Sequence, residues 1–169
     1  MRKLLSDLRC RSGYTLTEML VVIVLISILG ATAIVGITIS NRVSRMSILQ
    51  SRFSLVSDTI NISLKDMLVD SDYQRTEDGT VYFVSEKYSG WEMSLGISDG
   101  YIIAVIYDEI SGTRDGLLLS AASYAEFTVT DFSVIYSGGN YNCNYTLDCD
   151  LFSEEVEFVI APLNQAETI

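Results

Sequence analysis

The stretch that decides the fold is Met19–Ile39, which reads MLVVIVLISILGATAIVGITI and carries no charged residue. An α-helix rises about 1.5 Å per residue, so these residues would extend roughly 30 Å, the thickness of a bilayer core. The sequence therefore predicts a transmembrane helix over residues 14–40.

A second helical pattern follows directly. No proline or glycine occurs between Ile37 and Asp78, and apolar residues recur at intervals of three and four. This spacing places them on one face of a helix and predicts an amphipathic helix over residues 41–70. The residues of this stripe are Val43, Met46, Leu49, Phe53, Val56, Ile60, Leu64 and Met67.

From residue 71 onward the sequence changes to short apolar, aromatic and β-branched runs, which are typical of strands. Asp78-Gly79, Asp99-Gly100 and Asp115-Gly116 are turn signals between or beside them. We expect an α+β fold, in which a long N-terminal helix packs on a small antiparallel β-sheet domain formed by residues 71–169. The predicted strands are Thr80–Val84, Trp91–Ile97, Tyr101–Tyr107, Gly116–Ser120, Phe127–Tyr136 and Val156–Ala161.

Charge is distributed asymmetrically along the chain. Residues 1–13 contain four basic residues and one acidic residue, whereas residues 71–169 contain three basic and seventeen acidic residues. The basic flank predicts a cytoplasmic N-terminus and an extracytoplasmic C-terminal domain. A domain this acidic would repel phosphates, and direct binding to nucleic acid is therefore not expected.

The three cysteines fit this topology. Cys10 falls in the basic segment on the reducing side, and Cys143 and Cys149 fall in the acidic domain on the oxidising side. The simplest prediction is a disulfide between Cys143 and Cys149 that closes the short loop NCNYTLDC. Two free thiols are the alternative. A metal site is less favoured because the chain has no histidine.

The segment before the apolar run carries a motif. It reads Gly13-Tyr14-Thr15-Leu16-Thr17-Glu18 and follows a basic leader. This resembles the precursor signature of type IV pilins and of the pseudopilins of secretion and competence systems. That signature has a basic leader ending in glycine, then usually phenylalanine, threonine, leucine, a variable residue and glutamate. Tyr14 stands where phenylalanine is usual, and the resemblance covers about the first 45 residues.

The resemblance implies how the chain is processed and assembled. Residues 1–13 would be a leader that a prepilin peptidase removes between Gly13 and Tyr14, and the new amine of Tyr14 would be methylated. Residues 14–40 would anchor the precursor and then pack in the core of an extracellular or cell-surface filament. The implied partners are like subunits, an assembly platform and its motor ATPase. The filament could serve adhesion, motility, DNA uptake or secretion, and the chain would be a minor pilin or a pseudopilin.

Glu18 has a specific role in this resemblance. An ionised carboxylate beside hydrocarbon costs several kcal/mol unless it is paired. The sequence offers no obvious partner in the same helix. In pilin-like filaments this glutamate is thought to meet the processed N-terminal amine of a neighbouring subunit. Glu18 is therefore the predicted assembly residue. A glutamate that only favours the start of the helix is the alternative.

Two other interpretations of the N-terminal segment are open. Ala31-Thr32-Ala33 resembles the cleavage site of a secretory signal peptide. The apolar run continues beyond it to Ile39, however, and Glu18 abuts the apolar core. The second interpretation is a membrane-anchored extracellular binding domain that does not polymerise.

No catalytic arrangement stands out. The chain has no histidine for a triad and no phosphate-binding loop, so we expect neither an enzyme nor a cofactor. The acidic segment containing Asp108, Glu109, Ser111, Thr113 and Asp115 could offer oxygen ligands to calcium. Its spacing matches no standard calcium loop, so an acidic turn is favoured.

Overall fold

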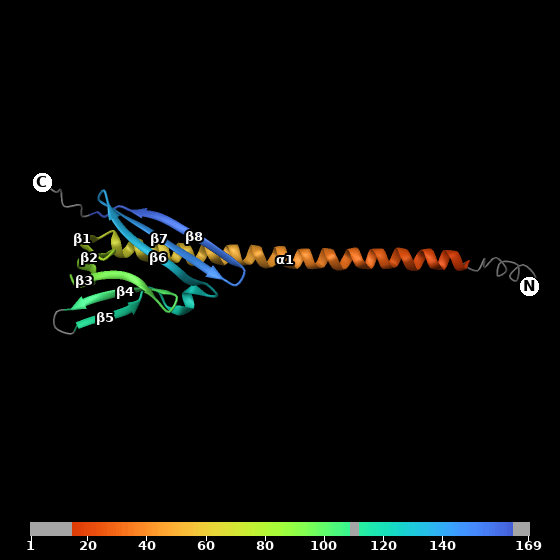
Figure 1. The fold of residues 1–169 in the computed structure, drawn as a ribbon, viewed down its shortest axis with the longest axis horizontal. Coiled ribbons are helices and arrows are strands. Elements are labelled where there is room, and N and C mark those ends of the chain that lie inside the picture. The colour runs from red at the N-terminus through yellow and green to blue at the C-terminus, as the bar shows by residue number, and fades with distance from the viewer. Residues whose placement is uncertain (1–14, 109–111, 164–169) are drawn as a thin grey trace, which may run out of the picture. The chain divides into compact units, whose positions relative to one another are not determined.

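The computed structural model describes residues 15–108 and 112–163. They form a long α-helix, α1 (Leu16–Leu68), followed by antiparallel strands and two short 3₁₀ helices (Figure 1). The α+β prediction is confirmed. The chain divides into two compact units, Met1–Ser47 and Ile48–Ile169, so α1 contributes to both.

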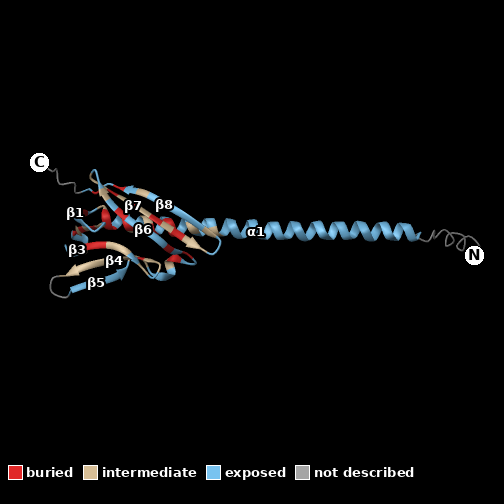
Figure 2. Cartoon of the chain, in the orientation of Figure 1, coloured by how far each residue is buried: buried red, intermediate tan, exposed pale blue. Residues whose placement is uncertain are grey.

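In the first unit the described residues are Thr15 and the amino-terminal part of α1. Every residue from 15 to 47 is exposed to solvent, including the whole apolar run (Figure 2). The hydroxyls of Ser27, Thr32 and Thr38 donate to carbonyls one turn earlier, which provides partners for polar groups in an apolar segment. By length and composition this helix could cross a membrane, and it fits a single-pass anchor.

The second unit contains two antiparallel sheets in which each strand pairs with its neighbour in sequence. The first sheet consists of β1 (Ser71–Glu77), β2 (Thr80–Ser85), β3 (Glu92–Ser98), β4 (Tyr101–Asp108) and β5 (Gly112–Leu117). The second consists of β6 (Thr128–Ser137), β7 (Asn140–Cys149) and β8 (Phe152–Ile160). The 3₁₀ helices Glu86–Tyr88 and Ala121–Tyr124 lie in the connections between strands.

Two predicted turns are confirmed. At Asp78-Gly79 and at Asp99-Gly100 both residues have positive φ, from 50° to 79°. Each pair connects adjacent strands, so these are the two-residue hairpin turns that match the twist of antiparallel strands. The third predicted turn is wrong, because Asp115-Gly116 lies inside β5 and pairs with Val105 and Ala104.

The strand prediction was incomplete. β1 and β7 were not predicted, and Leu118–Ser120 is not a strand. β1 is an edge strand whose only buried residue is Ser71, so it lacks an apolar signal. In β7, apolar residues alternate with polar ones, and the polar residues made the segment resemble a loop.

The core of the second unit lies between the end of α1 and the two sheets. Ile60, Leu64 and Leu68 on α1 are fully buried, as are Phe83 in the first sheet and Tyr145 in the second. Figure 2 shows these buried segments gathered among the strands. Burying such side chains contributes about 1.5–3 kcal/mol each, which holds this part of α1 to the sheets.

Candidate functional site

The candidate site lies at the amino end of α1, where Thr15 and Glu18 bind each other. The backbone N–H of Thr15 donates to Oε2 of Glu18 at 2.8 Å, and the Thr15 hydroxyl is 3.0 Å from the same oxygen. In return, the N–H of Glu18 lies 3.3 Å from Oγ1 of Thr15. This reciprocal arrangement is a capping box, in which side chains satisfy amide groups that the first helical turn leaves unpaired.

The capping box corrects one expectation. The sequence was interpreted as offering Glu18 no partner in its own helix, but Thr15 provides two donors. The signal was present in the sequence as Thr15-Leu16-Thr17-Glu18, the threonine-x-x-glutamate pattern that precedes many helices. A carboxylate in the first turn also interacts favourably with the positive end of the helix dipole. The structure thus fixes Glu18 at the start of the apolar helix.

The predicted cleavage and methylation residues, Gly13 and Tyr14, lie outside the described residues. So does Cys10 of the basic leader. The described residues start directly after them, with Thr15, which caps the helix, and Leu16, which is the first residue of α1.

The predicted disulfide between Cys143 and Cys149 is wrong in this structure, where both thiols are free. The two cysteines lie in one extended strand, β7, six residues apart. At about 3.3 Å per residue their Cα atoms are roughly 20 Å apart, far beyond the 7 Å limit for a disulfide. Pairing of β7 with strands on both sides keeps the segment extended instead of looped.

Cys143 belongs to a row of buried side chains that β7 turns towards the core. Burial raises the pKa of Cys143 to about 12, and burial likewise raises those of Tyr141 and Tyr145 to about 12. The hydroxyl of Tyr145 lies 2.9 Å from Oγ of Ser57 and donates to Oδ1 of Asn61 at 2.9 Å. These contacts join the second sheet to α1, so this polar cluster is structural.

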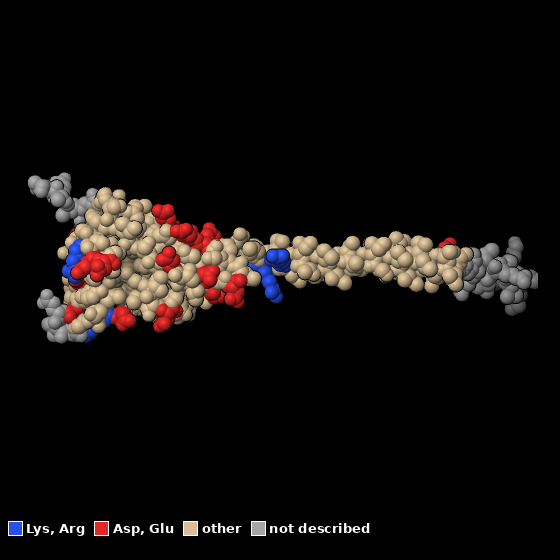
Figure 3. All heavy atoms as spheres, in the orientation of Figure 1, with Lys and Arg blue, Asp and Glu red and all other residues tan. Residues whose placement is uncertain are grey.

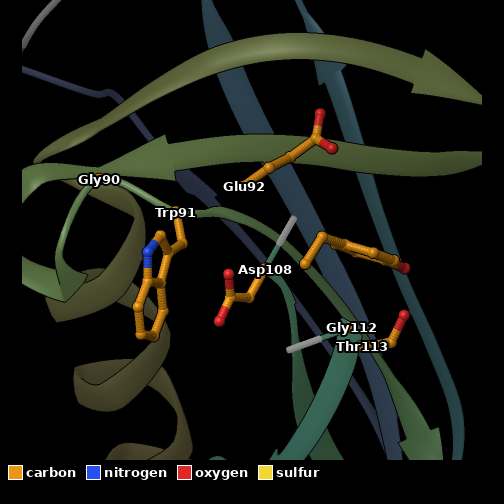
Figure 4. A pocket seen from close by; sticks show the side chains of 7 residues that line it. Gly90, Trp91, Glu92, Asp108, Gly112 and Thr113 are labelled. Carbon is orange, nitrogen blue, oxygen red and sulfur yellow. The ribbon is translucent and has the colours of Figure 1, made fainter. Parts of the chain in front are cut away.

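One surface pocket, of about 500 Å³, is lined by residues that include Trp91, Glu92, Tyr107 and Asp108 (Figure 4). Glu92 and Tyr107 are register partners and share a face of the first sheet. Asp108 follows Tyr107 and alternates to the other face, where Figure 4 places it beside Trp91. Glu92 is also bound by Arg75 at 2.7 Å. The carboxylates of Glu92 and Asp108 therefore do not point towards a common binding site.

The acidic segment considered for calcium includes the end of β4 and part of β5. Asp108 ends β4 opposite Gly112, and Thr113 and Asp115 lie in β5 opposite Tyr107 and Val105. Glu109 and Ser111 lie outside the described residues.

Elsewhere, acidic side chains are spread over the second unit (Figure 3). Within residues 15–108 and 112–163, no group of three or more candidate ligands could hold a metal ion.

Comparison with known proteins identifies the amino-terminal segment. Residues 8–34 match the family model described as the prokaryotic N-terminal methylation motif. No curated protein and no solved structure gave a match to the chain. The match contains the capping box and most of the apolar run. Residues 8–34 are therefore a type IV pilin-like prepilin signature, which is typical of structural subunits and not of enzymes.

Proposed function

We propose that this chain is a structural subunit of a type IV pilus-like filament. A prepilin peptidase cleaves the precursor after Gly13 and methylates the new amine of Tyr14. Residues 14–40 hold the precursor in the membrane with its N-terminus in the cytoplasm. The subunit then joins like subunits through this helix, driven by an assembly platform and a motor ATPase. The acidic second unit faces the outside.

The proposal rests on the position of Glu18. It lies inside the methylation motif at the start of an exposed apolar helix, and its carboxylate accepts hydrogen bonds from Thr15. Cleavage after Gly13 leaves the bond between Tyr14 and Thr15 intact. The amide of Thr15 that donates to Glu18 is therefore retained in the mature chain, and so is the cap. Carboxylate oxygens accept several hydrogen bonds, so Glu18 can hold its own helix start and also accept from an ammonium group of another subunit.

Two substitutions separate the charge of Glu18 from its capping role. Glutamine also completes a capping box, so Glu18→Gln retains the cap and loses the charge, whereas Glu18→Ala loses both. We expect both variants to be processed but to enter filaments at least about tenfold less than the parent. A loss of about 1.4 kcal/mol of pairing is enough for that factor. The measurement is the amount of mature chain in sheared filaments from the native cell.

Thr15→Ser serves as the matched control, because serine also caps a helix and leaves the charge of Glu18 unchanged. It should enter filaments like the parent. Normal incorporation of Glu18→Gln would show that Glu18 acts only as a cap. If the parent itself stays in the membrane and never enters filaments, the chain is an anchored domain that does not polymerise.

A further inference from the structure

Two arginines of α1 follow the apolar run directly. Arg42 and Arg45 lie three and six residues after Ile39, and both side chains are exposed. Three residues turn an α-helix by about 300°, so the two side chains leave α1 only about 60° apart. They therefore lie on one side of the helix, and we call them the arginine pair.

The arginine pair has no acidic neighbour along the helix. Between Glu18 and Asp58 the sequence contains three arginines and no acidic residue. The third arginine, Arg52, binds Glu126 at 2.8 Å. Among the residues that the structure describes, no salt bridge includes either member of the arginine pair. The described residues thus supply it with no anion.

The position of the arginine pair matches the far side of a bilayer. Along the helix, Arg42 lies roughly 36 Å and Arg45 roughly 40 Å from Glu18. A bilayer has a hydrocarbon core of about 30 Å and a thickness of about 40–45 Å with its headgroups. With Glu18 at the cytoplasmic edge of the hydrocarbon, Arg42 reaches the headgroup layer of the opposite leaflet. Helical side chains lean towards the amino end, so Arg45 leans back towards the same layer.

Membrane topology alone does not account for the arginine pair. Basic residues that set the orientation of a membrane helix gather on its cytoplasmic side, where this chain has four of them in residues 1–13. The arginine pair lies at the other end of the apolar run. Cleavage after Gly13 would remove the four basic residues and leave the arginine pair as the basic side chains nearest the membrane. This placement favours a binding role.

Phospholipid headgroups are the anions found at this depth. A guanidinium group is always charged, and its parallel N–H donors match two oxygens of a phosphate. In a zwitterionic headgroup an ammonium group offsets the phosphate, whereas phosphatidylglycerol has a net negative charge. Near an anionic membrane surface each basic side chain strengthens binding about fivefold. The chemistry therefore favours an anionic phospholipid.

From these observations we propose that Arg42 and Arg45 bind the phosphate groups of anionic phospholipids in the extracytoplasmic leaflet. The proposal rests on the membrane stage of the proposed function and assigns a lipid partner to a part of α1 beyond the methylation motif. The lipid contact fixes the depth of the helix at the end opposite Glu18. It has to be broken when the subunit leaves the membrane.

Photolabelling by lipids tests this partner. The full-length chain is reconstituted into phosphatidylcholine liposomes containing a trace of photoreactive phosphatidylglycerol or of photoreactive phosphatidylcholine, with the same reactive group on the acyl chain next to the glycerol. Fragmentation mass spectrometry counts the adducts on residues 40–47. Phosphatidylglycerol should label this segment at least about fivefold more than phosphatidylcholine. At about 1 M salt the ratio should fall towards one, because salt screens exposed charges.

Charge removal provides the second measurement. The double variant Arg42→Gln, Arg45→Gln should give nearly equal labelling of residues 40–47 by the two lipids. Arg114→Gln is the matched control, because Arg114 is also an exposed arginine without a salt bridge to another described residue, but it lies in β5. It should retain the ratio of the parent. These side chains are exposed, so their replacement should leave the fold intact.

The outcomes distinguish this proposal from the proposed function. Equal labelling of the parent by both lipids, or a double variant that keeps the ratio of the parent, would overturn the lipid site. The filament function would still stand if Glu18→Gln fails to incorporate. If the parent enters no filament, the filament function fails, and labelling in liposomes still decides whether the arginine pair binds lipid.

Discussion

At the scale of single residues, Cys143 shows how local conformation decides chemistry. It lies in the middle of β7 with its side chain fully buried, opposite Val134 on one side and Phe158 on the other. A thiolate is the reactive form of cysteine, and burial raises the pKa of this thiol to about 12. Cys143 is thus a packed apolar side chain and not a reactive group.

We expect the two cysteines of the second unit to react differently with an alkylating reagent. Cys149 is only half-buried and should be alkylated in the folded chain, whereas Cys143 should be alkylated only after unfolding. The measurement is the fragmentation spectrum of the tryptic peptide that contains both cysteines, from unreduced protein, before and after denaturant; trypsin does not separate them because Arg114 is the last basic residue. A peptide bearing a Cys143–Cys149 disulfide would contradict the extended conformation of β7.

Alkaline pH should destabilise the second unit. Cys143, Tyr141 and Tyr145 have pKa values raised to about 12 in the folded chain, against about 8.5 for cysteine and 10 for tyrosine when unfolded. Above pH 8.5 the unfolded chain therefore loses protons that the folded chain keeps. Stability falls as pH rises, by up to about 1.4 kcal/mol per pH unit for each such group.

Urea unfolding of the detergent-solubilised chain between pH 7 and pH 11 measures this fall. Tyr145→Phe removes one of the titrating groups, so the decline above pH 10 should be shallower, although the variant also loses the hydrogen bond to Asn61. Stability that stays constant from pH 7 to pH 11 would contradict the burial of these groups.

At the scale of elements, the surroundings of α1 change along its length. Its first part is apolar and exposed on all sides, and its last part turns one side to two sheets. Burial confirms the second half of the predicted stripe, at Val56, Ile60, Leu64 and Met67. Val43 and Met46 at its start are exposed.

A matched pair of substitutions tests the two sides of α1. Ile60→Ala removes a fully buried side chain and should lower the free energy of unfolding by about 2–5 kcal/mol. Ile62→Ala removes the same atoms from a side chain that is 67% exposed and should change it by less than about 0.5 kcal/mol. Both values come from urea unfolding of the monomeric chain. Similar losses for the two variants would mean that the assignment of faces is wrong.

At the scale of the whole molecule, processing decides where the chain resides. The methylation motif, the basic leader and the apolar run lead to one expected product. The mature chain should begin at Tyr14 and carry one additional methyl group, an increase of about 14 Da that reflects a single new N–CH₃ bond. Intact mass of the chain from its native cell measures this directly.

The same measurement separates the alternatives. A chain beginning near Ile34 would indicate cleavage by a secretory signal peptidase. An uncleaved chain would indicate a simple anchor. In either case the proposed filament function would fail.

The sequence by itself determined the parts that depend on local chemistry. An uncharged run of bilayer length, a three-and-four spacing and two aspartate-glycine turns predicted α1 and two hairpins. The motif around Gly13, Tyr14 and Glu18 predicted the signature that the family model matches. Each of these signals is contained within a short stretch of chain, so it can be interpreted without knowledge of the fold.

The tertiary structure alone decided the features that depend on distant pairing. Cys143 and Cys149 could close a loop or lie far apart in a strand, and pairing of β7 with β6 and β8 selects the strand. The division into two sheets and the choice of which side of α1 is covered are decided in the same way. Burial of apolar surface is shared among segments far apart in sequence, so no single segment specifies which of its sides remains exposed.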